Sequence, residues 1–358
     1  MTLSPFSLET YDYVLPPDLV AQTPAAFREA ARLMVVGSQC EHRLFSELPA
    51  LLRPGDLLVA NDTRVIAARF FPKRRGGGSA QVLLVHPAEE PGVWVAMARP
   101  GKRVRAGDQL VLGPGEGIEI VDWAPGGNRL VRFYGIDATT AMERYGQLPL
   151  PPYIRTPPAD AAQRYQTVYA AEDGSVAAPT AGLHFTKALI QQIRDAGVGW
   201  ATVTLRVGPG TFRPVKTADI RAHHMHPEWY HISAEAARQI AVARERGTRV
   251  IAVGTTSLRA LEDAAVQSAS GVVAQGARWT SLFVYPGYEF RVVDALITNF
   301  HLPKSTLLML VCAFAGTQRV LDAYAEAVRR RYRFYSFGDA MFLARGLGTT
   351  VAQSFPGG

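Results

Sequence analysis

The densest group of residues that could do chemistry is the segment His223-His224-Met225-His226-Pro227-Glu228. Its His-x-His-x-Glu pattern could supply metal ligands, or His226 and Glu228 could act as an acid–base pair. A zinc deaminase would also need a later Pro-Cys-x-x-Cys, but the chain has only the distant Cys40 and Cys312. Metal binding is therefore disfavoured, and acid–base chemistry stands beside an ordinary solvated turn as an interpretation.

Three other loops share one arrangement, in which small or hydroxyl-bearing residues lead into a predicted helix. They are residues 174–186, which carry Thr180 and His184; residues 254–257, which carry Thr255, Thr256 and Ser257; and residues 299–306, which carry Asn299, His301 and Lys304. Unpaired amides at a helix N-terminus attract anionic groups, and small residues let a ligand approach the backbone. Together the loops could hold a ligand with a carboxylate, hydroxyls and a polar ring. Each could equally be a structural turn, with core histidines.

Two common nucleotide signatures are absent. The turn at residues 208–214 (GPGTFRP) has neither the lysine-bearing phosphate loop nor the GxGxxG spacing. No GxSxG nucleophile motif occurs either.

The charge balance favours a polyanionic partner, because the chain carries a net charge of +7 with a pI near 9.5. Basic residues gather in three patches, at residues 73–75, 99–105 and 329–333. The last patch is interleaved with aromatic residues that could stack on bases. Each patch could equally be a solvated face.

The composition is that of a globular protein without a membrane span or disulfide framework. The chain has 358 residues, 48% of them hydrophobic and 19% charged, which suits two domains or a large domain with an insertion. Its longest apolar run, residues 307–316, is well short of the roughly 18 residues of a membrane helix. The N-terminus lacks the layout of a signal peptide. With two cysteines, a reducing cytoplasm is the expected location.

The pattern of elements predicts a discontinuous α/β domain, residues 1–65 and 149–358, with an inserted β domain at residues 66–148. Between 66 and 148, short alternating runs separated by Gly and Pro predict a small antiparallel barrel or sandwich. Elsewhere we expect a mixed sheet or open barrel with outer helices. Its predicted strands are residues 33–36, 57–60, 198–207, 248–253, 280–285, 292–300 and 334–343, and its predicted helices are 187–196, 233–246, 255–267, 304–316 and 318–332.

Several long sequence motifs occur in order along nearly the whole chain. They are NDTRVI (61–66), RYQTVYA (164–170), GSVAAPTAGLHFT (174–186), MHPE (225–228), VGTTS (253–257), YPGY (285–288), LITNFHLPKST (296–306) and YRFYSFGDAM (332–341). This set closely resembles the S-adenosylmethionine:tRNA ribosyltransferase-isomerase family of queuosine biosynthesis. The resemblance implies a distorted open barrel with an inserted small β-barrel.

The resemblance also implies a reaction. The ribosyl part of S-adenosylmethionine would be transferred to the aminomethyl-deazaguanine wobble base of a tRNA with a GUN anticodon, giving epoxyqueuosine and releasing adenine and methionine. S-adenosylmethionine would be a co-substrate, with no metal or other cofactor, and we expect a monomer. The alternatives are a non-catalytic or divergent tRNA-binding relative and a metal-dependent hydrolase built on residues 223–228.

Site residues follow from their positions in the matched motifs. The resemblance implies that proton handling falls to His184, His226, Glu228 and His301. Residues positioning S-adenosylmethionine or the target nucleotide would be Asp62, Arg64, Thr180, Thr255, Thr256, Ser257, Asn299 and Lys304. Candidates for binding tRNA phosphates are Arg74, Arg75, Arg103, Arg105, Arg330, Arg331 and Arg333. One departure is Arg206, where the family typically has His; an arginine cannot act as a base.

Overall fold

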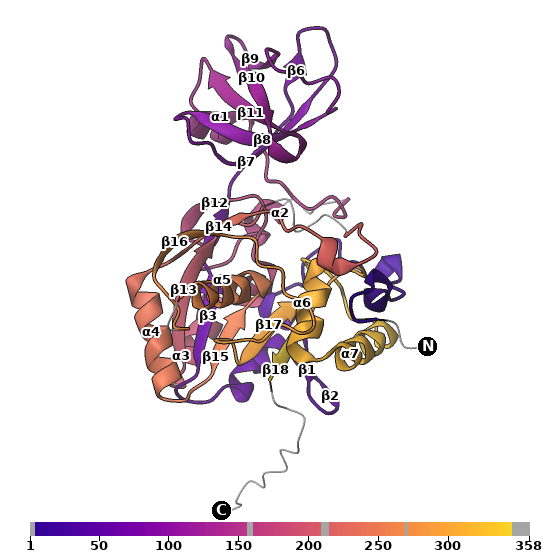
Figure 1. Cartoon of the computed structure of the whole chain (residues 1–358), viewed down its shortest axis with the longest axis vertical. Coiled ribbons are helices and arrows are strands. Elements are labelled where there is room, and N and C mark those ends of the chain that lie inside the picture. The colour runs from indigo at the N-terminus through magenta and orange to yellow at the C-terminus, as the bar shows by residue number, and fades with distance from the viewer. Residues whose placement is uncertain (1–3, 156–159, 209–214, 269–270, 346–358) are drawn as a thin grey trace, which may run out of the picture.

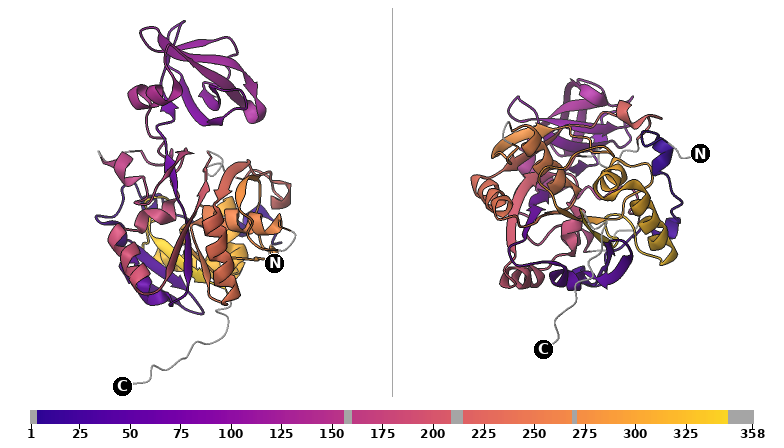
Figure 2. Two further views of the ribbon diagram at one scale, coloured as in Figure 1. Left: turned by 90° about the vertical axis from the view of Figure 1, so that its left-hand side faces the viewer. Right: turned by 60° about the horizontal axis from the view of Figure 1, so that its bottom comes forward.

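The computed structural model describes residues 4–155, 160–208, 215–268 and 271–345. All of the predicted turn at 208–214 except Gly208 therefore lies outside the described residues. Two sheets dominate the fold: a large mixed sheet surrounded by helices, and a smaller curled sheet beyond one end of it (Figures 1 and 2).

The large sheet has nine strands. In spatial order they are β16 (Gly276–Thr280), β14 (Glu228–Ile232), β13 (Gly199–Leu205), β3 (Leu57–Asn61), β15 (Val250–Val253), β17 (Ala295–Asn299), β18 (Ala340–Ala344), β1 (Arg32–Val36) and β2 (Cys40–Leu44). The central strands β13, β3, β15 and β17 are mutually parallel. Strands β3, β15 and β17 are buried along their whole length, as expected for parallel strands covered on both faces.

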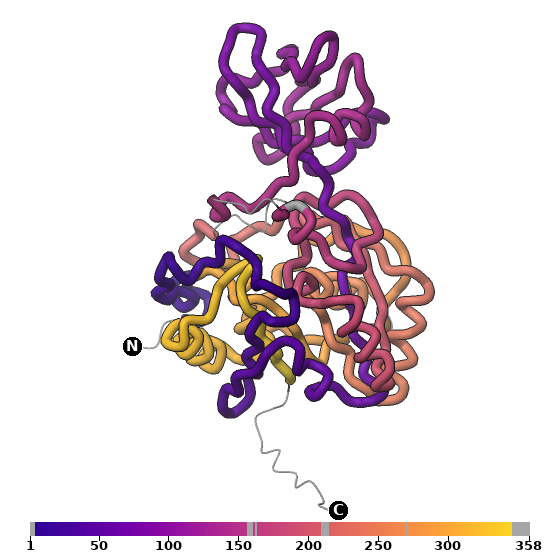
Figure 3. The backbone as a smooth tube through the Cα atoms, turned by 180° about the vertical axis from the view of Figure 1, so that it is seen from behind, coloured from indigo at the N-terminus to yellow at the C-terminus, as the bar shows by residue number. Residues whose placement is uncertain are grey.

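Helices cover both faces of this sheet. One core cluster joins alternate strand residues to α4 (Ala234–Glu245), α5 (Thr255–Val266), α6 (Thr306–Ala315) and α7 (Thr317–Arg329). The other cluster joins the opposite set to α3 (Lys187–Asp195) and the short 3-10 helix at Phe45–Leu51. Along β3, Leu57 and Val59 face the first cluster, whereas Leu58 and Ala60 face the second. Figure 3 shows the N-terminal segment running beside the C-terminal helices.

The smaller sheet is entirely antiparallel and has seven strands. Their order is β5 (Arg69–Phe70), β7 (Gln81–Pro87), β8 (Val93–Arg99), β11 (Asn128–Tyr134), β10 (Glu116–Ala124), β9 (Gln109–Gly113) and β6 (Lys73–Arg74). The two edge strands, β5 and β6, are separated in the chain by only Phe71 and Pro72, so the sheet must curl to bring its edges together. Helix α1 (Ala138–Tyr145) packs against it, with Tyr145 donating to Glu116 at 2.6 Å.

The chain enters and leaves the curled sheet along one short pair of strands. Strand β4 (Thr63–Val65) leads out of the large sheet, and β12 (Glu172–Ser175) pairs with it in parallel after the chain has passed α2 (Ala161–Arg164). The hydroxyls of Thr63 and Ser175 lie 2.8 Å apart, and Ser175 Oγ accepts a hydrogen bond from the Val207 amide at 2.7 Å. Both passages of the chain are therefore joined to the end of β13.

The predicted combination of a large mixed sheet and a separate antiparallel sheet agrees with the structure, but some strands were predicted wrongly. Residues 281–285 are not a strand; β16 ends at Thr280, whose hydroxyl is bonded to Asp263. The strand predicted at 334–343 begins only at Ala340, because Tyr335 adopts a φ of 77° in a turn. Strands β14 and β2 were not predicted.

No single helix in the described ranges is long and apolar enough to cross a membrane. Only α6 and α7 taken together, bent by 116° at their junction, reach the length and composition of a span.

Helix α5 gives the first testable prediction. The Glu262 carboxylate is fully buried and accepts the backbone N–H groups of Arg291, Val292 and Val293 at 2.8–3.0 Å. Replacing Glu262 with Ala leaves these amides without an acceptor and should lower the free energy of unfolding by about 3 kcal/mol. Urea denaturation measures this. The exposed Glu245→Ala on α4 serves as the control and should change stability by less than about 0.5 kcal/mol; equal effects would contradict the assignment.

Candidate active site

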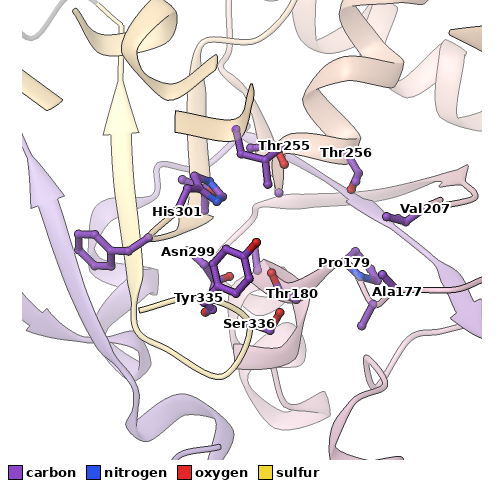
Figure 4. A pocket seen from close by; sticks show the side chains of 16 residues that line it. Ala177, Pro179, Thr180, Val207, Thr255, Thr256, Asn299, His301, Tyr335 and Ser336 are labelled. Carbon is purple, nitrogen blue, oxygen red and sulfur yellow. The ribbon is translucent and has the colours of Figure 1, made fainter. Parts of the chain in front are cut away.

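A cavity with about 550 Å³ of empty space, part of it open solvent, lies at the carboxyl ends of the central parallel strands, the usual ligand position in such sheets. It brings together the three loops that the sequence suggested. The lining consists of residues 177–181, 254–256 and 298–301, with Val207, Leu307, Tyr335 and Ser336. Figure 4 shows Thr255 and Thr256 on one side and Thr180, Asn299, Tyr335 and Ser336 on the other, with His301 at one end. Among these described lining residues none carries a full charge at neutral pH.

The start of helix α5 forms one wall of this cavity. Gly254 precedes the helix with a φ of 90°, which a residue with a side chain rarely adopts, and it provides no capping side chain. The amides of the first turn are therefore available to a ligand. Ser257 does not face the cavity, because its hydroxyl donates to the Val253 carbonyl at 2.8 Å.

Asn61 joins this helix to the ends of two strands. Its Nδ2 donates to the Leu205 carbonyl at 2.9 Å and to Thr256 Oγ1 at 3.2 Å, while its Oδ1 accepts the Leu205 amide at 2.9 Å. The side chain is fully buried. Sequence reasoning did not single out Asn61, although its place at the end of a buried strand was a usable signal.

Asn299, which lines the cavity, has an acceptor without a partner. Its Nδ2 donates to the Tyr335 carbonyl at 3.0 Å and lies 3.3 Å from Nε2 of His184. The residue is only 2% exposed, yet its buried Oδ1 has no hydrogen-bond partner. A buried acceptor without a donor is costly, so a ligand that donates a hydrogen bond here would gain from it.

Two of the predicted histidines are neutral because they are buried. Burial, assisted by the charges of Arg333 and Arg28, lowers the pKa of His184 to about 3, and burial lowers the pKa of His301 to about 3. Nε2 of His301 lies 2.9 Å from the Thr298 hydroxyl, and His301 lines the cavity. His184 does not line the cavity; its ring packs against Phe45, and its Nε2 lies within hydrogen-bonding distance of the lining residue Asn299.

A second, larger cavity lies between the two sheets and has about 2,150 Å³ of empty space, part of it open solvent. Its walls include His86 and Met97 of the curled sheet, and residues 222–228, which lead into β14 of the large sheet. Consecutive residues divide between the two cavities: Val207 and Leu307 line the first, Gly208 and Thr306 the second. The two cavities therefore adjoin.

The predicted acid–base pair lies in this second cavity. His226 is exposed there, whereas Glu228 is buried and begins β14. One oxygen of Glu228 accepts the Gly208 amide at 2.9 Å, and the other is paired with the buried guanidinium of Arg259. No group of three or more His, Cys, Asp or Glu side chains within the described ranges could hold a metal ion. Residues 223–228 thus offer a hydrolase no metal-ligand cluster.

Three other predicted binding residues line neither cavity. Asp62 accepts the Thr204 hydroxyl at 2.7 Å, and burial raises the pKa of its carboxyl. Arg64 donates to the Ala170 carbonyl at 2.8 Å. Lys304 is paired with Glu9 and Asp12 at 2.8 and 3.0 Å, which raises the pKa of its ammonium. By contrast, sequence reasoning did not select Thr298, Tyr335 and Ser336, which do line the first cavity.

The predicted phosphate-binding arginines fall into two groups. In the curled-sheet domain, Arg75, Arg103 and Arg105 are exposed. Arg75 donates to the neutral side chain of Gln109 at 2.6 Å, and Arg74 donates to the Gly77 carbonyl at 3.1 Å. On the large domain, carboxylates already accompany the guanidinium groups: Arg330 pairs with Glu326, Arg331 with Asp18 at 2.6 Å, and Arg333 lies 3.9 Å from Asp339. The first group has more charge available for a phosphate.

Comparisons with known proteins agree with this architecture. Residues 8–343 match the family model described as a queuosine biosynthesis protein. The chain is 50% identical over 342 residues to the S-adenosylmethionine:tRNA ribosyltransferase-isomerase of Moorella thermoacetica and 51% identical over 342 residues to that of Natranaerobius thermophilus, covering 94% of this chain and 99% of each relative. The crystal structure of S-adenosylmethionine tRNA ribosyltransferase from Thermotoga maritima is similar with a TM-score of 0.53 at 39% identity, over 93% of this chain and 99% of that one.

The buried histidines predict how stability depends on pH. Below about pH 6.5 both histidines become protonated in the unfolded chain. In the folded protein His184 and His301 stay neutral until much lower pH, since their pKa values there are about 3. The free energy of unfolding should therefore be highest above about pH 6.5. It should decrease as the pH falls toward 3, by about 1.4 kcal/mol per pH unit for each histidine.

Urea denaturation between pH 7 and 4.5 checks this expectation. His184→Gln removes one such group, so its free energy of unfolding should fall less steeply than that of the wild type. The exposed His224→Gln is the control and should keep the wild-type slope. Parallel curves for His184→Gln and wild type would show that His184 is not buried in its neutral form.

Proposed function

Because this chain belongs to the family of S-adenosylmethionine:tRNA ribosyltransferase-isomerases, enzymes of queuosine biosynthesis, we propose the full reaction that it catalyses. It transfers and isomerises the ribosyl moiety of S-adenosylmethionine onto the aminomethyl-deazaguanine wobble base of a tRNA with a GUN anticodon. The products are epoxyqueuosine-tRNA, adenine and methionine. S-adenosylmethionine is a co-substrate, and the sulfonium supplies the activation without a metal or other cofactor.

One observation carries this proposal: three loops distant in sequence meet in a single uncharged cavity that adjoins a much larger one. An uncharged cavity with amide donors at the start of α5 and an acceptor at Asn299 Oδ1 suits a neutral heterocycle such as adenine. The larger cavity has room for an extruded nucleotide. The sugar is then transferred where the two cavities meet.

The chemistry defines what the protein must provide. A sulfonium acidifies the C–H bond beside it, so a base can remove that proton and start the elimination of adenine. The neutral amine of the tRNA base then attacks the sugar, and the ring oxygen set free displaces methionine as the epoxide closes. A cavity that excludes water protects the intermediate.

We assign proton handling to His301 in the first cavity and His226 in the second. His184 supports the reaction by orienting Asn299, and Glu228 by holding Arg259 and the Gly208 amide. Thr180, Thr255, Thr256 and Asn299 position the substrates. Asp62, Arg64, Ser257 and Lys304 hold the surrounding loops through the contacts described above.

Adenine release tests this function. With S-adenosylmethionine and a precursor tRNA, the wild type should release one adenine per modified tRNA. His301→Ala and His226→Ala should each lower the single-turnover rate by about 100-fold, which is typical of losing a general acid or base. His42→Ala is the control, because His42 lines neither cavity and pairs with Tyr332 instead. Tight tRNA binding without adenine release would indicate a non-catalytic relative.

The arginines give a separate prediction about tRNA binding. Arg103→Glu and Arg105→Glu should weaken tRNA binding and lower the slope of log affinity against log salt by about 1 for each phosphate that is no longer neutralised. Arg330→Glu should have a smaller effect, because Glu326 already neutralises that side chain. Fluorescence anisotropy at several salt concentrations measures both quantities. A larger decrease in affinity for Arg330→Glu would move the phosphate-binding surface to the large domain.

A further inference from the structure

Three strands at one edge of the large sheet place a cation and two tryptophans in a row. Arg206 directly follows β13 and its amide donates to the Trp229 carbonyl of β14 at 2.9 Å. Trp229 in turn stands directly opposite Trp279 of β16. Because neighbouring positions across a sheet point to the same face, the three side chains share one surface. That surface is not covered: Trp279 is 50% exposed.

The guanidinium of Arg206 is held in place without a counterion. Its Cζ lies 4.3 Å from the centroid of the Trp229 ring, an attractive cation–π geometry. On its other side lies Gly174, where a Cβ atom would approach Nε of Arg206 to 2.7 Å. Nε is buried without a hydrogen-bond partner, and within the described ranges no acidic group pairs with this arginine. The nearby Asp173 lies instead 3.7 Å from Arg64.

The row continues to the second cavity. The ring of His86, which lines that cavity on the curled sheet, contacts Trp279 edge-on at 5.3 Å. His231, on the same strand β14, stacks on Trp229 with the rings 16° from parallel. Strands β14 and β16 also lie at the end of the large sheet nearest to β7 (Figure 1). The surface is therefore continuous with the space assigned to the extruded nucleotide.

We propose that Arg206, Trp229 and Trp279 form a stacking platform for unpaired bases of the tRNA anticodon loop that flank the target nucleotide. This inference rests on the function proposed above. Planar aromatic faces with an adjacent unpaired cation suit single-stranded RNA, whose bases stack on such rings while arginine attracts the phosphates. The platform also gives Arg206 a role outside the first cavity, which it does not line.

The test uses the full chain and fluorescein-labelled RNAs: an anticodon stem-loop and the stem duplex alone. Trp279→Ala should weaken stem-loop binding by about tenfold, since stacking of one base is worth about 1–3 kcal/mol, and Trp279→Phe should restore most of it. Duplex binding should not change. The control Phe27→Ala removes an exposed aromatic residue of the large domain, 73% accessible, that lines neither cavity.

Salt dependence separates the cation from the rings. Arg206→Gln should lower the salt slope of stem-loop binding by about 1, whereas Trp279→Ala should leave it unchanged. The KM for S-adenosylmethionine should stay within about twofold in both variants. If wild type binds the stem-loop and releases adenine but Trp279→Ala binds as tightly as wild type, the platform is refuted and the proposed function stands. If wild type releases no adenine and binds no stem-loop, the proposed function and the platform both fail.

Discussion

Helix α5 carries three buried ionisable side chains, Arg259, Glu262 and Asp263. The contacts that pair them fix the position of the helix in the fold. Arg259 is paired with Glu228 of β14, Glu262 accepts three consecutive backbone amides, and Asp263 accepts hydroxyls from Tyr230 and Thr280. An unpaired charge in the interior costs several kcal/mol, so every one of these contacts must form together. The helix cannot rotate or slide without breaking them, and its N-terminus is therefore fixed where the first cavity lies.

That fixed terminus explains the character of the cavity. The amides of the first turn provide positive ends of dipoles without a mobile charge, and Asn299 provides an oriented acceptor on the facing side. His184 and His301 contribute polarity but remain neutral, because burial opposes their protonation. Such a preorganised, uncharged environment discriminates by hydrogen-bond pattern. The second cavity, by contrast, is lined by His226 and by Glu228, which is paired with Arg259.

Local signals in the sequence predicted the starts of helices well. The helix predicted at residues 187–196 begins where α3 begins, at Lys187, and Thr186 caps it by accepting a 3.1 Å hydrogen bond from the Leu189 amide. Features that depend on distant partners were not predictable. The strand that begins at Glu228 was not predicted, and the Arg259 side chain that pairs with Glu228 lies 31 residues away. The Asn299 bond to the Tyr335 carbonyl, across 36 residues, holds a turn within an apparently continuous strand, and Lys304 is drawn to Glu9 across 295 residues.

The paired strands β4 and β12 connect the curled sheet to the large sheet. They are the only ordered β connection between the two sheets in the part of the chain that the structure describes. Their hydroxyl contact reaches the Val207 amide at the rim of the first cavity, and Asn61 at the root of β4 reaches Thr256. Any change in the orientation of the curled sheet relative to the large sheet must therefore be accommodated by residues that also contact the rim of the first cavity.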